Sequence, residues 1–177
     1  RDSSLVQMDD SLNIKPEIAS KWNISKDGLT YTFFLRNDVF FHESDLFGIE
    51  KTRKVIASDF EYSFKRLRSE KIGSPGGWVL NNVNYFKALS DSIFMIQLNN
   101  KFPAFLSLLS MRYCSVVPHE VVDFYGEKFR ENPIGTGPFK LKRWIENEKL
   151  VLVKNKNYFE FDKKGNRLPY LDAIAVT

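Results

Sequence analysis

The sequence is poor in the side chains that carry covalent or metal chemistry. It contains one cysteine and two histidines among 177 residues. A single cysteine excludes an internal disulfide, and Cys114 lies in an apolar stretch, which predicts a small buried side chain. Neither His42 nor His119 has a neighbouring cysteine, serine or carboxylate arrangement that resembles a catalytic triad or a metal site. We therefore predict no enzyme activity, no metal and no cofactor.

Long apolar runs are also absent, and each apolar run present is far too short to cross a bilayer. The sequence begins at Arg1, with neither an initiator methionine nor the regions of a signal peptide. We expect any signal peptide or lipid anchor to lie upstream of Arg1.

Charge of one sign does not dominate the sequence. Lysine and arginine total 26, aspartate and glutamate total 22, and the formal net charge is +4. The densest basic cluster, Lys65–Arg68 with Lys71, falls at the end of a predicted helix, where the helix dipole favours positive charge. The sequence contains no zinc-ligand spacing, recognition-helix signature or RNA-binding sheet motif. These observations argue against a nucleic-acid partner.

Aromatic residues are abundant by contrast. Sixteen phenylalanines and a hydrophobic content of 43% predict a globular piece with one sizeable core. Residues Leu29–Arg36 alternate between apolar and polar, with Tyr31 and Phe33 on the apolar face, and they follow an Asp27-Gly28 turn. This pattern predicts a β-strand.

Residues Asp59–Leu67 predict a helix. Phe60, Phe64 and a leucine three residues later fall on one helical face. Ser58 and Glu61 have the spacing of a capping box, which predicts Ser58 as the N-cap of this helix.

The segment Asn132–Phe139 contains a Gly135-Thr-Gly137 sequence that raises the question of a phosphate-binding loop. Such a loop needs a helix after it, and a Walker loop also needs lysine followed by serine or threonine. Here a proline follows, and then Lys140–Ile145 alternates like a strand. We interpret the segment as a rigid turn, followed by two strands joined around Asn147.

Four separate patterns, in this order along the chain, resemble those of the bacterial extracellular solute-binding proteins of family 5. This family contains the oligopeptide-, dipeptide- and nickel-binding subunits of ABC importers. The matching residues are Ala19, Trp22, Ser25, Asp27, Gly28, Tyr31, Thr32, Phe33, Leu35, Arg36, Val39, Phe41, Ala57, Asp59, Phe60, Ser63, Arg66 and Leu67, then Pro133, Gly135, Thr136, Gly137, Pro138 and Phe139, then Asn155, Tyr158 and Phe159, and last Leu168–Asp172. The resemblance extends from about Leu5 to Val176.

The resemblance implies a mixed α/β fold, as a piece of the first lobe of a two-lobed binding protein. Family members are much longer than this chain, so the second lobe is expected to be absent from it. Residues 15–132 are expected to form the interior subdomain of the first lobe. Residues 1–14 and 133–177 are expected to supply strands to the adjoining sheet. Exposed edges of such a piece predict self-association.

The resemblance also implies a function outside the cytoplasmic membrane. The expected location is the periplasm or the cell surface, with or without a lipid anchor. The parent protein is expected to bind a peptide or a similar small solute and to deliver it to an ABC permease without catalysis. Its contact with the membrane would come only from the permease or from an upstream anchor. An alternative is a ligand-sensing module of a regulator or receptor, which the flanking sequence would distinguish.

In the resembling family, the first lobe contributes to the ligand site through the loop that follows the capped helix. Here that loop is Ile72–Trp78, and Gly77 and Trp78 are the candidate contacts. A tryptophan can cover a peptide from one wall of a cleft. The alternative is that Trp78 begins a helix that extends to Phe86 and packs inward.

A second candidate segment follows the apolar helix predicted over Ala104–Leu109. Here Met111 and Arg112 are the candidate ligand contacts. Arg112 could pair with a ligand carboxylate or stay solvated. The identity of the ligand stays open, because residues His42–Arg53 form a longer insertion than the family pattern has at this position.

Overall fold

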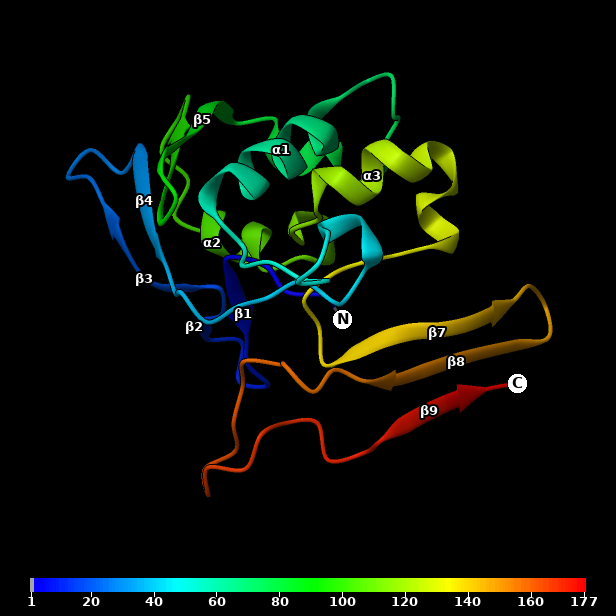
Figure 1. Cartoon of the computed structure of the whole chain (residues 1–177). Helices are drawn as coiled ribbons and strands as arrows, with labels where there is room; N and C mark the ends of the chain where they lie inside the picture. Colours follow the sequence, from blue (N-terminus) through cyan, green and yellow to red (C-terminus); the bar gives the residue numbers. More distant parts are fainter. Residues whose placement is uncertain (1) are drawn as a thin grey trace. The chain divides into compact units, whose positions relative to one another are not determined.

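The computed structural model describes residues 2–177, and the contacts among these residues divide them into two compact units. Unit 1 consists of residues 2, 38–55 and 117–177, and unit 2 of residues 3–37 and 56–116. Both units combine strands with short helices (Figure 1), so the predicted mixed α/β fold is confirmed. No helix within residues 2–177 is long and apolar enough to cross a bilayer.

Unit 2 is built around a four-stranded antiparallel sheet with the strand order β3-β4-β6-β5. Its elements are β1 Val6–Met8, β2 Ile14–Pro16, β3 Ala19–Ile24, β4 Thr30–Leu35, α1 Ala57–Arg68, the 3-10 helix η2 Gly77–Leu80, β5 Val83–Ser90, β6 Ile93–Leu98, α2 Phe105–Leu109 and the 3-10 helix η3 Arg112–Cys114.

The strand predicted over Leu29–Arg36 is confirmed as β4, and its alternation is confirmed as well. Tyr31 and Phe33 are buried, and they lie opposite Ile96 and Phe94 of β6. The turn before β4 needs a glycine, since Gly28 has a φ of 74°. The period-two pattern predicted this strand because one face of the sheet is buried and the other is not.

Helix α1 covers the sheet with the predicted apolar stripe. The rings of Phe60 and Phe64 are fully buried, and their centroids lie 5.9 Å and 5.5 Å from that of Phe94. Phe86 of β5 adds an edge contact to Phe64 at 5.6 Å. Aromatic pairs at these separations stabilise a core beyond the area they bury.

The prediction of Ser58 as the N-cap of α1 is wrong. The helix begins at Ala57, so that Ser58 lies exposed inside its first turn. The carboxylate of Asp59 accepts a hydrogen bond from the Ile56 N–H at 2.9 Å instead. Glu61, the other member of the predicted capping box, accepts hydrogen bonds from the Ala88 N–H and from Lys65. The Ser-x-x-Glu spacing gave the wrong start because tertiary contacts engage Glu61.

Unit 1 contains a three-stranded antiparallel sheet with the order β7-β8-β9. Its elements are the 3-10 helix η1 Asp45–Phe47, α3 His119–Tyr125, the 3-10 helix η4 Gly126–Glu131, β7 Phe139–Ile145, β8 Lys149–Lys154 and β9 Ala173–Val176. The two strands predicted around Asn147 are confirmed as β7 and β8, and Asn147 has a φ of 59° at their turn.

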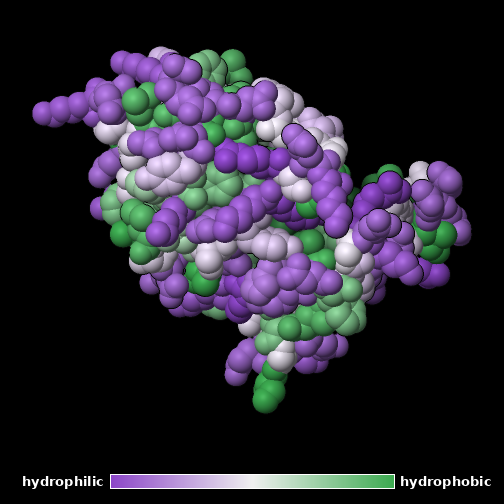
Figure 2. Space-filling view, turned by 90° about the horizontal axis from the view of Figure 1, so that it is seen from above, coloured by the Kyte–Doolittle hydropathy of each residue, from purple (hydrophilic) through white to green (hydrophobic). Residues whose placement is uncertain are grey.

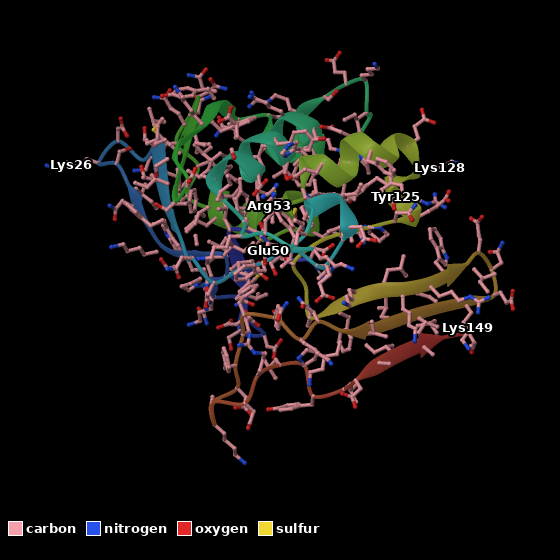
Figure 3. All side chains as sticks on the ribbon, viewed as in Figure 1. Lys26, Glu50, Arg53, Tyr125, Lys128 and Lys149 are labelled. Atoms are coloured by element: carbon pink, nitrogen blue, oxygen red, sulfur yellow. The ribbon has the colours of Figure 1, made fainter. Side chains whose placement is uncertain are left out.

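Arg53, which is labelled in Figure 3, lies at the end of the insertion His42–Arg53 in unit 1. Its guanidinium lies 5.0 Å and 5.6 Å from the ring centroids of Phe41 and Phe47. It also donates to both carboxylate oxygens of Glu120 on α3, with Nη2 at 2.8 Å from Oε2. A bidentate pair combined with stacking gives this loop a defined structure.

Hydrophilic side chains cover most of the face shown in Figure 2, and the apolar side chains that reach this face form separate small groups. Within residues 2–177 the most exposed large apolar side chains are Ile49, Leu12, Phe124 and Tyr170. These residues are spread along the chain.

The hydrogen bond at the start of α1 predicts different effects on stability for substitutions at Asp59 and at Ser58. Asp59→Ala removes the carboxylate that accepts from Ile56, and we expect it to lower the free energy of unfolding by roughly 0.5–2 kcal/mol. Ser58→Ala is the matched control, and it should leave stability nearly unchanged. Urea denaturation of both variants measures the difference. A larger loss in Ser58→Ala than in Asp59→Ala would contradict this description of the helix start.

Candidate functional site

The loop between α1 and β5 carries the first two candidate ligand contacts. Trp78 lies on η2 with 49% of its surface exposed, whereas the next two residues, Val79 and Leu80, are buried. The alternative of a helix from Trp78 to Phe86 is wrong, because η2 ends at Leu80 and β5 begins at Val83. Trp78 is therefore exposed on a short 3-10 turn, and the buried side chains of Val79 and Leu80 anchor this turn.

Gly77 allows this loop to lie close to the end of α1. A Cβ on Gly77 would stand 3.1 Å from the Leu67 carbonyl oxygen, which is tighter than ordinary contact. The Gly77 N–H donates to the Ser74 carbonyl at 3.1 Å, and this bond closes the turn. A hollow of about 410 Å³ lies beside Gly77, lined mainly by the loop and by the C-terminal end of α1.

The second candidate segment is the turn that follows α2. Met111 is 37% exposed, and Arg112 is exposed at the start of η3. The Arg112 guanidinium lies 5.4 Å from the centroid of the Tyr113 ring. Within residues 2–177 no carboxylate forms an ion pair with Arg112. An exposed guanidinium without a protein carboxylate is available to an anionic group.

Unit 2 brings the two candidate segments together. Gly76 is buried, and a Cβ placed on it would lie 2.6 Å from the Cβ of Tyr113 and closer still to the Cγ of that ring. Gly76 directly precedes Gly77 and Trp78, and Tyr113 directly follows Arg112. The packing of Gly76 against Tyr113 therefore places the two segments side by side. Contact of these residues with a ligand stays a prediction.

His42 lies at the Gly135-Thr136-Gly137 turn of unit 1, and sequence reasoning missed this role. The His42 N–H donates to the Gly135 carbonyl at 2.7 Å, and the Gly135 N–H donates to Nδ1 at 3.3 Å. With Nδ1 accepting, Nε2 carries the proton and donates to the Gly137 carbonyl at 2.9 Å. The rigid turn predicted at Gly135–Gly137 thus has a buried histidine as its partner, and strand β7 follows the turn, as expected.

Other polar groups complete the contacts of this turn. Asn155 donates to the Gly137 carbonyl at 2.9 Å, and the Gly137 N–H donates to the Asp2 carboxylate at 3.4 Å. A Cβ at Gly135 would stand 2.6 Å from Oδ2 of Asp2 and closer to Oδ1, so a side chain at this position would displace the Asp2 carboxylate. The N–H and carbonyl groups of both Gly135 and Gly137 are therefore bound by the protein itself.

The pKa of His42 is lowered, chiefly because burial disfavours the charged imidazolium. The hydrogen bond to Gly137 and the negative charge of Asp2 act in the opposite direction, and the positive charge of Lys140 lowers the pKa further. His42 is 3% exposed, and both of its ring nitrogens are engaged by backbone groups. It is neutral in the folded protein and serves the structure of the turn.

His119 has a different environment, since it is exposed at the first turn of α3. Its Nδ1 lies 3.2 Å from the carboxylate of Glu120, which Arg53 already engages. Cys114 is buried as predicted, and burial raises the pKa of its thiol to about 12. Within residues 2–177 no group of three or more histidine, cysteine, aspartate or glutamate side chains is arranged to hold a metal ion.

Comparison with known proteins places this geometry in context. Residues 13–177 match the family model described as bacterial extracellular solute-binding proteins, family 5, middle. The dipeptide-binding protein of Escherichia coli is 29% identical over 178 aligned residues, which cover 92% of this chain and 32% of that protein.

Solved structures agree with the sequence match. The periplasmic binding protein DppA of Helicobacter pylori, in complex with the peptide STSA, superposes with a TM-score of 0.84 at 30% identity, over 98% of this chain and 36% of that chain. NikZ of Campylobacter jejuni, in complex with Ni(L-His), gives a TM-score of 0.78 at 30% identity, over 93% of this chain and 32% of that one. The chain thus spans about a third of the length of the proteins it matches.

The contacts of His42 generate a pH-dependent prediction. Because the folded state lowers the pKa of His42, the unfolded chain takes up a proton more readily than the folded chain below about pH 6.5. The contribution of His42 to stability is therefore complete above that pH and decreases as the pH falls toward the lowered pKa. We expect the free energy of unfolding to decrease between pH 7.5 and 5.5.

Urea denaturation of two variants at both pH values tests the assignment to His42. His42→Asn should cost roughly 1–3 kcal/mol at pH 7.5, because buried backbone groups lose their partner, and it should remove part of the pH dependence. His119→Asn is the matched control and should keep the wild-type slope. An unchanged slope in His42→Asn would refute the assignment.

Proposed function

The chain belongs to family 5 of the bacterial extracellular solute-binding proteins, and from this premise we propose that the protein carrying it captures a peptide or a similar small solute and delivers it to an ABC permease. The proteins of this family are binding proteins, and the proposal includes no catalysis. Relatives that bind dipeptides, an STSA peptide and a nickel–histidine complex support a small solute as the ligand class. The comparisons do not favour the alternative of a sensing module.

The observation that carries the proposal is that Trp78, Met111 and Arg112 are exposed on two segments of unit 2 that meet where Gly76 packs against Tyr113. An indole can cover a peptide backbone, and a methionine side chain can adapt to ligands of different shape. The Arg112 guanidinium can form a bidentate pair with a carboxylate, such as the C-terminus of a peptide. Together with Gly77, these residues would form one wall of the ligand site.

We also propose a location and an organisation for the parent protein. Its place is outside the cytoplasmic membrane, in the periplasm or at the cell surface, and an upstream lipid anchor is one means of retention. Residues 15–132 are the interior subdomain of its first lobe, residues 1–14 and 133–177 contribute to the adjoining sheet, and a second lobe supplies the opposite wall. Self-association of the isolated chain belongs to the same proposal.

Binding by the isolated chain tests the one-wall arrangement. A closed cleft buries most of its ligand, whereas a single wall leaves much of the ligand surface in water. We expect the chain of residues 1–177 to bind peptides weakly or not at all, and the full-length gene product to bind at least one member of a panel. The panel contains a dipeptide, the tetrapeptide Ser-Thr-Ser-Ala and the nickel–histidine complex, each titrated by calorimetry. Submicromolar binding by the isolated chain would contradict the one-wall arrangement.

The role of Trp78 generates a second test in the full-length gene product. Trp78→Ala should weaken binding of the panel ligand by at least about 1 kcal/mol, with little change in the thermal melt, because the indole is half-exposed. Trp22→Ala, which removes a partly buried indole from β3, is the control and should leave affinity unchanged. A loss of roughly 3–5 kcal/mol in stability without a selective loss of affinity would mean that Trp78 is a core residue.

A further inference from the structure

The contact between Gly76 and Tyr113 depends on space and not on backbone conformation. Gly76 has φ −96° and ψ 1°, values that residues other than glycine adopt. A Cβ at this position would nevertheless overlap the Cβ, Cγ and Cδ1 atoms of Tyr113. Glycine is therefore needed at residue 76 because the Tyr113 ring occupies the volume of a side chain.

The Tyr113 ring belongs to the second candidate segment and also packs against the first. Gly76 of the first segment packs against it, and the guanidinium of Arg112 lies 5.4 Å from its centroid. An arginine at this distance is attracted to an aromatic ring. Within the part of the chain that the structure describes, the Tyr113 hydroxyl makes no hydrogen bond, so the ring itself forms these contacts.

Each segment is also anchored close to this contact. In the first segment, Val79 and Leu80 are buried directly after Trp78, and the Val79 N–H donates to the Gly76 carbonyl at 3.1 Å. In the second segment, Cys114 is 1% exposed, and its N–H donates to the Met111 carbonyl at 3.0 Å. Each turn is thus anchored on one side of the contact, and the Tyr113 ring is a spacer that packs between the two turns.

We propose that Tyr113 is a positioning residue whose ring sets the separation between Trp78 and Arg112. This inference depends on the proposed function of the surface as a ligand wall. The distance between Trp78 and Arg112 selects solutes in which the carboxylate lies at the same distance from the group that the indole covers. A smaller side chain at residue 113 leaves space beside Gly76, so the Trp78 turn loses its defined position and the selection becomes weaker.

Fluorine NMR of the 177-residue chain labelled with 5-fluorotryptophan tests the positioning without any ligand. The Trp78 resonance is assigned with Trp78→Phe, and the resonances of Trp22 and Trp144 serve as internal controls. Gly76→Ala and Tyr113→Ala should each shift or broaden the Trp78 resonance alone. Tyr113→Phe, which keeps the ring, should match the wild type.

A double variant distinguishes a spacer from general loosening. In Gly76→Ala/Tyr113→Ala the new methyl group enters the space that the ring has left, so the Trp78 resonance should lie closer to the wild type than in Gly76→Ala alone. If Gly76→Ala does not fold, Tyr113→Leu provides the second measurement, since it keeps bulk without a planar ring and should shift Trp78 less than Tyr113→Ala. A Trp78 resonance that is the same in Tyr113→Ala and in the wild type would overturn the proposal.

Calorimetry on the full-length gene product with Ser-Thr-Ser-Ala as the probe tests the consequence for binding. We expect Tyr113→Ala to weaken binding at least fivefold with an unchanged thermal melt, and Tyr113→Phe to bind like the wild type. If the wild type binds the tetrapeptide and Tyr113→Ala binds it equally well, the selective role of Tyr113 is refuted. If the wild type binds no panel ligand while Trp78 still responds to Tyr113→Ala, the proposed function fails and the positioning contact stands.

Discussion

The packing of phenylalanine rings between α1 and the sheet of unit 2 determines where the candidate ligand wall can form. Phe60 and Phe64 pack α1 against Phe94 of β6. The loop from α1 to β5 begins at the end of this helix. Arg68, the last residue of α1, donates to the Val83 carbonyl at 2.7 Å and lies 4.9 Å from the ring centroid of Phe86. The loop that carries Trp78 is therefore held at both ends by the core.

Unit 1 is governed by a different constraint, namely the need of buried backbone groups for hydrogen-bond partners. Thr136 is fully buried between two glycines, so the amides around it cannot reach water. His42, Asn155 and Asp2 bind this backbone. A neutral histidine suits the position, since its two nitrogens provide one donor and one acceptor. A residue that could have been considered a catalytic base is thus used to satisfy the turn.

The structural role of His42 agrees with the proposed binding function, which requires no catalytic base. An exposed indole and a guanidinium without a protein carboxylate suit the proposed recognition of a solute, whereas His42 and Asn155 of unit 1 bind backbone groups of the turn. The chain covers about a third of its relatives, so this wall represents one side of the proposed site. The close approach of Gly76 to Tyr113 packs the two segments of this proposed wall against each other, and such preorganisation lowers the entropic cost of binding.

The sequence by itself determined the family, the mixed α/β fold, strand β4 and the apolar stripe of α1, because these depend on local periodicity and on turn residues such as Gly28. Only the tertiary structure decided the start of α1, where Asp59 accepts from Ile56 while a contact with β5 engages Glu61. Only the tertiary structure joined His42 to Gly135, across 93 positions of sequence, and Gly76 to Tyr113. Such contacts depend on distances between segments that folding brings together, and a sequence pattern records which side chains are present but not which of them meet.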